Sequence, residues 1–224
     1  MHIVFDINET LLDTAALNPL FEEMFGTSQM RQVWFLTLQE HWMTATLTDQ
    51  FLPFGELATA ALRQVAQQQD QPVSEAQQQA LVEGLQTLPA HPDTLPALEW
   101  LSRQGHTLTA LTNGSLTALQ TQLQHAGLTG LFDAELSVEQ VQRYKPAPQA
   151  YRLVMDHWGI DPSEMTMVAA HSWDVIGASH AGCLTGFIAR PGKALDPGGF
   201  RPTWQDTDLE SLTRQIVAAT PVHR

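Results

Sequence analysis

The sequence contains a single cysteine, Cys183, among its 224 residues. One cysteine excludes both an internal disulfide and a metal cluster held by several thiolates. The N-terminus, MHIVFDINET, lacks the basic segment followed by a long apolar stretch that marks a secretory signal. No apolar run approaches the length needed to span a bilayer. We therefore expect a cytoplasmic protein that does not associate with membranes.

Basic residues are scarce: 11 lysines and arginines stand against 24 aspartates and glutamates, which gives a formal net charge of −13. Such a negative field opposes nonspecific binding to nucleic acid or to an anionic membrane. A small anionic substrate would need a local positive charge, since the molecule as a whole repels it. The hydrophobic content of 43% is ordinary for a globular protein, and the length fits one large domain or a core with an insertion.

The first half of the chain combines one strand pattern with a long helical stretch. Residues 2–6, HIVFD, are short and apolar, as in a buried parallel strand. Ser74 and Gln77 have the spacing of a capping box. Helical spacing of apolar residues recurs at 17–25, 29–47, 55–69 and 75 to about 89. We therefore expect residues 14–90 to form an all-helical unit.

After residue 93 the pattern alternates. Helices are expected at 94–104, 115–126, 148–158 and 173–181, and strands at 106–112, 132–137, 165–170 and 184–189. Strands that alternate with helices of this length indicate a parallel sheet wound with crossover helices. The sequence therefore predicts an α/β core made of residues 1–13 and 91–224, in which residues 14–90 are a helical insertion after the first strand.

Polar residues stand where the expected strands end, and in parallel sheets ligands bind at those ends. Asp6 ends the first strand, and Thr112 and Asn113 end the second. His171 follows a later strand, with Asp174 in the next turn, and Lys145 precedes a helix. Each of these residues alone has a structural explanation, such as a turn, a helix cap or a surface lysine. Their joint register with strand ends favours a functional site.

Four motifs, in order, carry a resemblance to a known family. DINET from Asp6, TNGS from Thr112, KPAPQAY from Lys145 and AAHSWD from Ala169 resemble the haloacid dehalogenase superfamily, in particular its type II 2-haloacid dehalogenase branch. The resemblance implies a Rossmann-like core with an inserted helical cap domain, and often a homodimer. It also implies an aspartate nucleophile, here Asp6, that displaces halide from a short 2-halo carboxylate and forms an ester that water then cleaves.

Asn8 lies where phosphatases of the superfamily carry an acidic residue that protonates the leaving group. An amide cannot transfer a proton, whereas a departing halide is a weak base that needs none. Phosphoryl transfer also relies on magnesium, which prefers oxygen ligands. Ala170 and His171 stand where an acidic pair would be expected, so we expect no metal and no cofactor. Asn8 thus favours displacement at carbon.

Roles follow for the remaining site residues. Lys145 would keep Asp6 ionised and attract the substrate carboxylate, because an opposite charge within about 4–6 Å lowers an aspartate pKa by roughly one to three units. Asp174 would orient Lys145 or the hydrolytic water. His171, if nearly neutral, would take a proton from that water, although a purely structural hydrogen bond is the alternative. Contacts to the substrate or to the nucleophile are expected from Asn8, Thr10, Thr112, Asn113 and Tyr151, and from Phe35 and Trp42 of the cap.

Four positions depart from what the resemblance implies: three from the branch, among them His171, which stands where the branch usually has asparagine, and Glu9, which departs from the superfamily. Phe35 replaces an arginine of the second cap helix that holds substrate or halide, which removes a full charge and a forked donor. The candidates to replace it are His41, Trp34, Trp42 and aromatic ring edges, since ring edges are positive. Ala169 stands in place of a serine, and Glu9 in place of a glycine. Two other functions therefore stay open: a magnesium-dependent phosphatase, or a binding protein that kept the fold and lost the chemistry.

Overall fold

A six-stranded parallel sheet forms the centre of the protein. The computed structural model describes residues 1–219. The strands are β1 (His2–Phe5), β2 (Thr107–Thr112), β3 (Ala134–Ser137), β4 (Met165–Ala169), β5 (Leu184–Ile188) and β6 (Trp204–Asp206). Their order is β3-β2-β1-β4-β5-β6, and each neighbouring pair is parallel. The order reverses direction at β1, so a crevice opens at the carboxyl end of that strand.

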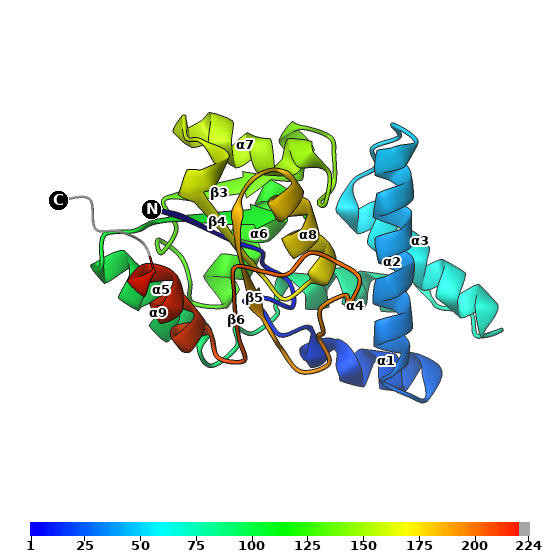
Figure 1. Cartoon of the computed structure of the whole chain (residues 1–224). Helices are drawn as coiled ribbons and strands as arrows, with labels where there is room; N and C mark the ends of the chain where they lie inside the picture. Colours follow the sequence, from blue (N-terminus) through cyan, green and yellow to red (C-terminus); the bar gives the residue numbers. More distant parts are fainter. Residues whose placement is uncertain (220–224) are drawn as a thin grey trace.

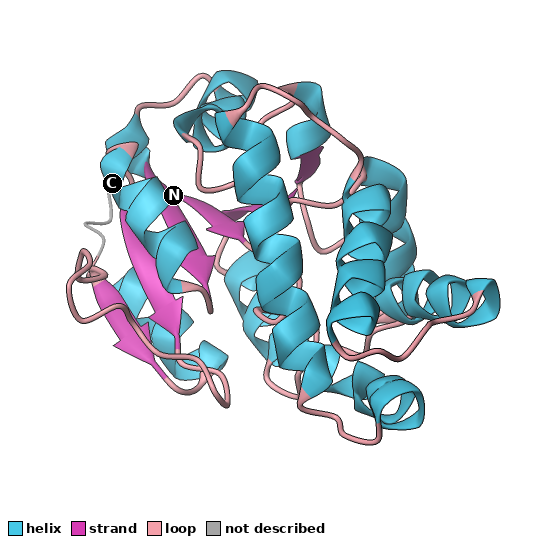
Figure 2. Ribbon diagram, turned by 90° about the vertical axis from the view of Figure 1, so that its right-hand side faces the viewer, coloured by secondary structure: helices cyan, strands magenta, loops and turns pink. Residues whose placement is uncertain are grey.

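Helices cover both faces of the sheet (Figure 2). They are α5 (Thr94–Arg103), α6 (Leu116–His125), α7 (Pro148–Trp158), α8 (Ser172–His180) and α9 (Leu209–Ala218). Ile3 and Phe5 belong to one hydrophobic cluster with residues of α5, α6 and α9, whereas Val4 belongs to a second cluster with residues of α7 and α8. Because side chains alternate along a strand, β1 is buried on both faces.

Four helices form the cap inserted after β1. They are α1 (Asn18–Phe25), α2 (Met30–Leu47), α3 (Phe54–Gln68) and α4 (Glu75–Gln86), and Figure 1 shows α1, α2 and α3 to one side of the sheet. Gly26 ends α1 in the left-handed conformation, and Ser74 and Gln77 form the expected capping box before α4. Short 3-10 turns cover Thr14–Leu17, Val138–Gln140 and Pro162–Glu164.

The cap is held to the core by apolar packing. Trp34, Leu38 and Trp42 recur at helical spacing on α2 and are buried, and the indole of Trp34 donates to the carbonyl of Ala58 on α3 at 2.9 Å. These cap residues share one hydrophobic cluster with Ile3 and Phe5 of the sheet. The cap therefore rests on the core in the region where β1 ends.

The predicted α/β fold with a helical cap is confirmed. The predicted helices and strands occur within a few residues of their expected bounds, but β6 and α9 were not predicted. No helix among residues 1–219 is long and apolar enough to cross a membrane. The exact limits of the two units, 1–13 with 91–224 and 14–90, stay a prediction.

Gly177 provides a test of the packing that supports the site. A Cβ at this position of α8 would lie 2.5 Å from the hydroxyl of Tyr151 and 2.8 Å from the carbonyl oxygen of Pro146. We expect Gly177→Ala to lower the free energy of unfolding by about 1–3 kcal/mol, because a well-packed contact must move. In α3, Gly55 has nothing within 4 Å of its added Cβ, so Gly55→Ala serves as the control. Urea denaturation measures both; equal effects would contradict the prediction.

Candidate active site

The carboxyl ends of β1, β2 and β4 bring the expected site residues together. A small cavity of about 20 Å³ lies beside Asp6. Its lining consists of Asp6, Asn8, Phe35, Trp42, Phe54, Thr112, Asn113, His171 and Trp173. The cavity is therefore lined by the proposed nucleophile, by residues at the end of β2 and by aromatic side chains from the cap.

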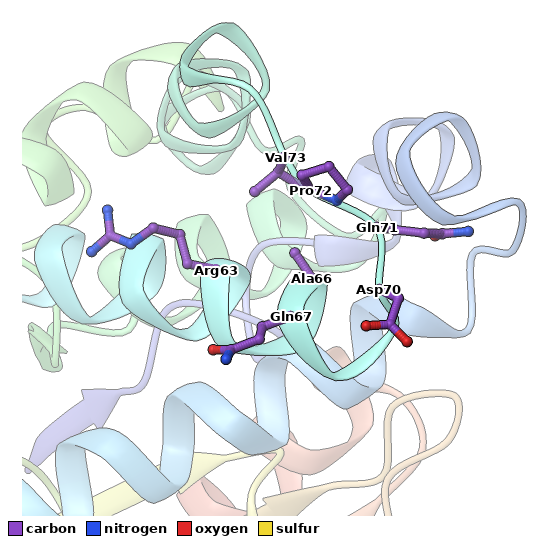
Figure 3. Close-up of a pocket in the computed structure, with 7 residues that line it drawn as sticks. All are labelled: Arg63, Ala66, Gln67, Asp70, Gln71, Pro72 and Val73. Carbon is purple, nitrogen blue, oxygen red and sulfur yellow. The ribbon is translucent and has the colours of Figure 1, made fainter.

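A larger hollow of about 490 Å³ lies elsewhere, at the end of α3 and the loop that follows (Figure 3). Arg63 and Gln71 extend from it in different directions, and its other side chains come from Ala66, Gln67, Asp70, Pro72 and Val73. Polar groups that converge on one point mark a reactive site. Such convergence occurs beside Asp6 and is absent from this hollow.

Both carboxylate oxygens of Asp6 are held in place. Lys145 Nζ donates to Oδ1 at 2.7 Å, and the Thr10 hydroxyl donates to Oδ2 at 2.6 Å. The Thr10 oxygen accepts in turn from the backbone N–H of Ala170 at 2.9 Å. Thr10 thus ties the loop after β1 to the end of β4 and fixes the orientation of the nucleophile, as expected, without lining the cavity.

Lys145 is fully buried and has three acceptors for its three protons. Besides Asp6, its Nζ donates to Asp174 Oδ2 at 2.8 Å and to the carbonyl of Leu111 at 3.1 Å. The side-chain oxygen of Asn113 accepts from the backbone N–H of Lys145 at 2.8 Å. Burial lowers the pKa of Lys145, but the two carboxylates outweigh it and raise that pKa above its ordinary value. Lys145 is therefore a charged residue that holds Asp6, and its protons are already shared.

Asp174 and Tyr151 hold Lys145 in place through a chain of hydrogen bonds. Tyr151 is buried, and its hydroxyl donates to Asp174 Oδ1 at 2.7 Å. Tyr151 does not line the cavity, and its expected contact with the substrate stays a prediction. Tyr151 positions Asp174. Asp174 in turn orients Lys145, which is one of the two roles expected for Asp174.

The surroundings of Asp6 keep it ionised. Burial raises its pKa, but the charge of Lys145 and the hydrogen bond and charge of His171 lower it further than burial raises it. The net result is a pKa well below the ordinary value of 3.8. A carboxylate in this state is available as a nucleophile across the whole neutral range.

His171 lies between two carboxylates. Its Nδ1 is 3.1 Å from Asp6 Oδ2, and its Nε2 is 2.8 Å from Glu9 Oε2. A neutral imidazole has one donor, whereas two facing carboxylates favour a donor on both nitrogens. Burial lowers the pKa of His171, but the bonds to Asp6 and Glu9 raise it above 6.5 overall. The base role of His171 requires a nearly neutral imidazole, and the two carboxylates oppose that state while Asp6 is ionised.

Glu9 is fixed by cations from two parts of the chain. Lys193, from the loop after β5, pairs with Oε2, and Arg31 of the cap donates to Oε1 at 3.3 Å. Burial raises the pKa of Glu9, but His171 and Lys193 lower it to about 2. Its backbone φ is +66°, in the left-handed region that favours glycine, where the resembling branch has glycine. The backbone of Glu9 is therefore strained, and its side chain holds His171 in place.

An aromatic wall covers the other sides of the cavity. Phe35 stacks on the His171 ring with centroids 5.6 Å apart, and Trp173 stacks on the same ring at 4.8 Å. Trp42 meets both Phe35 and Trp173 edge to face, each at 5.7 Å between centroids. Phe35 thus occupies the position where the branch has an arginine, and its ring contacts the charged imidazole of His171.

The amide of Asn8 is already engaged on one side. Its oxygen accepts from Gln122 Nε2 at 2.9 Å, which leaves its NH₂ group as the part that is able to donate. Thr112 lines the cavity beside it, although the Thr112 hydroxyl accepts from the backbone N–H of Gly114 at 2.9 Å. Asn8 therefore offers hydrogen bonds without a transferable proton.

The comparisons with known proteins agree with this geometry. A family model for haloacid dehalogenase-like hydrolases matches residues 1–182. The chain belongs to the haloacid dehalogenase-like hydrolase family. It is 30% identical to an (S)-2-haloacid dehalogenase of Pseudomonas sp. strain CBS-3, over 97% of this chain and 96% of that one. It is 28% identical to the (S)-2-haloacid dehalogenase of Pseudomonas sp. strain YL, over 97% and 94%.

Among solved structures, an L-2-haloacid dehalogenase with 28% identity superposes with a TM-score of 0.92 over 97% of this chain and 98% of that chain. The expected resemblance to this branch of the haloacid dehalogenase family is confirmed. Similarity over nearly the whole length includes the cap, so the likeness is not restricted to the sheet.

The donor set fits a metal ion poorly. Among the described residues no group of three histidine, cysteine, aspartate or glutamate side chains comes together as a metal cluster. Asp6 and Asp174 share the Lys145 ammonium, and Glu9 contacts two cations and His171. A divalent cation prefers several oxygen ligands without competing positive charges. The residues at this site of the haloacid dehalogenase fold do not fit Mg²⁺.

Sequence reasoning missed five residues of the site: Glu9, Arg31, Phe54, Lys193 and Trp173. One signal was present. Glu9 and His171 both depart from the pattern of the haloacid dehalogenase branch, and the structure joins them by a hydrogen bond. Two departures that pair by charge indicate a contact. Arg31 and Lys193 gave no such signal, because nothing in the sequence distinguishes them from ordinary surface cations.

The titration of His171 tests the network. Its raised folded-state pKa means that the charged imidazole contributes its stability fully below pH 6.5, and that this contribution is lost as the pH rises through the raised pKa. We expect NMR titration to place the His171 pKa above 6.5, and Glu9→Gln to lower it.

The stability cost of His171→Asn should also shrink as the pH is raised, as measured by urea unfolding. His157→Asn on the surface of α7 is the matched control for replacing a histidine. An unchanged His171 pKa in Glu9→Gln would contradict the contact.

Proposed function

We propose that this hydrolase displaces halide from short 2-halo carboxylic acids and releases the 2-hydroxy acid. The observation that carries the proposal is the state of Asp6: an ionised carboxylate with both oxygens fixed, at the edge of an aromatic cavity, followed by Asn8 in place of an acid. The relatives named above as 2-haloacid dehalogenases support the same chemistry.

In the first step an oxygen of Asp6 attacks C2 of the substrate. The new carbon–oxygen bond takes its electron pair from the carboxylate, and the carbon–halogen bond breaks with its pair leaving as halide. Neither bond change requires a proton, so an amide at Asn8 is sufficient. Lys145 and Thr10 hold the attacking carboxylate in one orientation. Its reaction with a bound substrate is therefore effectively unimolecular.

In the second step water attacks the carbonyl carbon of the Asp6 ester, and the bond from that carbon to the substrate oxygen breaks. The departing alkoxide takes the proton that His171 has accepted from the water, which releases the 2-hydroxy acid and restores the Asp6 carboxylate. Ester formation removes the negative charge of Asp6, so His171 loses one of the two carboxylates that keep it protonated. Its pKa falls, it releases the Nδ1 proton to solvent, and it then accepts a proton from the attacking water. Glu9 retains the Nε2 proton and fixes the tautomer. The base role of His171 thus arises only after the first step.

Substrate entry requires movement. A cavity of about 20 Å³ has room for roughly one water-sized particle, and a 2-halo acid is several times larger. Phe35 and Trp42 belong to the cap, whereas Asp6 and His171 belong to the core. Displacement of the cap from the core would open the cavity, and closure around the substrate would exclude water from the first step.

The first test is halide release from chloro, bromo and fluoro 2-carboxylic acids in EDTA. We expect Asp6→Asn to reduce release by about 10⁴-fold or more, because the nucleophile is lost. Asp156→Asn, on the exposed surface of α7, is the matched control. A parallel reaction contains a phosphate ester and magnesium. Release of phosphate alone would indicate a phosphatase. Release of neither halide nor phosphate would indicate a protein that lacks both activities.

Oxygen labelling tests the ester. After one turnover in H₂¹⁸O we expect the label in the Asp6 side chain, detected by mass spectrometry of the peptide, because water attacks the Asp6 carbonyl. If water instead attacked C2 directly, the label would appear in the hydroxy acid during the first turnover. That result would overturn the covalent pathway while leaving the overall reaction in place.

Glu9→Gln tests the second step. We expect a normal burst of halide followed by turnover slower by about 10²–10⁴-fold, because His171 no longer has the carboxylate that fixes it as a base. The ester should accumulate on Asp6 and be visible as an added mass. Glu23→Gln, on the exposed face of α1, is the control. A lost burst with no ester would place Glu9 in the first step.

A homodimer and a cytoplasmic location stay predictions for this haloacid dehalogenase-like protein. Light scattering on the purified protein measures the first, and cell fractionation the second.

A further inference from the structure

Gln122 connects the cap to a residue of the cavity without lining the cavity itself. It belongs to α6 of the core, and only 4% of its surface is exposed. Its Nε2 atom donates to the carbonyl oxygen of Leu85 in α4 at 2.7 Å and to the side-chain oxygen of Asn8 at 2.9 Å. Asn8 lines the cavity beside Asp6. Gln122 therefore stands between a cap helix and a side chain that borders the ligand-binding space.

The carbonyl of Leu85 decides which end of the Gln122 amide points toward it. A backbone carbonyl oxygen only accepts hydrogen bonds, so the group that contacts it must be the NH₂ of Gln122. Leu85 lies in the last turn of α4, where carbonyl oxygens have no partner within the helix. This oxygen is therefore available to fix Gln122, and the second proton of the same NH₂ is directed at Asn8.

The orientation of the Asn8 amide follows from that of Gln122. The proton from Gln122 needs an acceptor, and the strong acceptor of the Asn8 side chain is its oxygen. The NH₂ group of Asn8 is then the end that Gln122 does not contact. This NH₂ has no acceptor within residues 1–219 and is not sealed inside the protein. Because Asn8 lines the cavity, we infer that the side chain offers a ligand its donor and not its acceptor.

We propose that Gln122 is a positioning residue that holds the NH₂ end of Asn8 toward the substrate, and that this pair makes the site select a carboxylate over the corresponding neutral amide. The inference rests on the proposed function. A carboxylate only accepts hydrogen bonds, so a fixed donor stabilises it, whereas an amide oxygen in the same place would repel it. The hydrogen bonds from Leu85 through Gln122 to Asn8 are already formed, so the donor needs no reorganisation when the anion binds.

The cap takes part in this selection. Leu85 belongs to α4 of the cap, whereas Gln122 and Asn8 belong to the core. Displacement of α4 from α6 would break the contact that orients Gln122, and either end of the Asn8 amide could then face the cavity. The polarity of Asn8 is therefore fixed when the cap is closed on the core. Closure would select the anion at the same time as it excludes water from the reaction.

Binding of propionate and propionamide to the resting protein tests the assignment without turnover. The side chain in Gln122→Glu has at most one proton; if Leu85 accepts it, the oxygen beside Asn8 accepts in turn and the Asn8 amide must rotate. We expect this variant to bind propionate about 10- to 100-fold more weakly, the usual effect of losing a hydrogen bond to a charged group. Propionamide should bind about as it does to wild type. Gln124→Glu, on the exposed side of the same helix, is the matched control.

A second variant covers the case in which Gln122→Glu does not fold. Gln122→Met keeps the length of the side chain and removes both donors, so Asn8 is free to take either orientation. We expect a smaller loss of propionate affinity, again with little change for propionamide. In Asn8→Leu, which has no polar group to orient, replacing Gln122 should leave the preference between the two ligands unchanged.

Isothermal titration calorimetry gives the affinities, and three outcomes would overturn the inference. The first is wild-type protein that does not prefer propionate to propionamide. The second is an unchanged preference in the Gln122 variants that fold. The third is an equal loss of affinity for both ligands, which is what a purely structural role of Gln122 predicts.

Turnover separates this inference from the proposed function. With 2-bromopropionate we expect the Gln122 variants to have a raised KM and a kcat close to that of wild type, because the contacts of Asp6 are untouched. Halide release with a KM that does not depend on Gln122 would overturn the inference and leave the proposed function in place. A Gln122-dependent preference for propionate without turnover of any 2-halo acid would instead overturn the proposed function and keep the inference.

Discussion

The buried contact between Lys145 and Asp6 is the constraint on which the rest of the site depends. Two opposite charges taken out of water are stable only when both are present and their remaining hydrogen bonds are made. Asp174, Leu111 and Asn113 meet that requirement for Lys145, and Thr10 meets it for Asp6. These residues come from different strand ends, so the parallel sheet is what brings one ionised carboxylate and its ammonium within 2.7 Å.

The local charge is the reverse of the global charge. Near Asp6, the carboxylates of Asp6, Glu9 and Asp174 are accompanied by Lys145, Lys193, Arg31 and a protonated His171. Four cationic groups around three carboxylates leave one net positive charge in the cluster, although the whole chain carries −13. A substrate anion that enters the cavity neutralises that charge. The expectation that an anionic substrate needs a local cation is thus met by a cluster, with its protonated histidine at the cavity.

The sequence was most informative where one period dominated. Alternation and helical spacing predicted the sheet, the cap and the strand-end residues, because burial of one face dictates those patterns. The edge strand β6 has only three residues, too few for a period. The helix α9 was not predicted either, although Leu209, Leu212 and Ile216 have a helical spacing. The contact of Lys193 with Glu9 could not be predicted, since the two residues lie 184 positions apart and contact at that separation is decided by the tertiary fold.

The departures from the branch form one coherent change. An arginine on a cap helix supplies positive charge to the site only while the cap is closed, whereas His171 and Glu9 both belong to the core, and Lys193 holds Glu9 from the same unit. Phe35 then gains a different function: stacked at 15° on the His171 ring, it excludes water from a charged imidazole that already has both nitrogens satisfied. Because Lys145 and His171 both belong to the core, the charges that lower the pKa of Asp6 do not depend on the position of the cap. The cap retains the task of closing an aromatic wall over the reacting carbon.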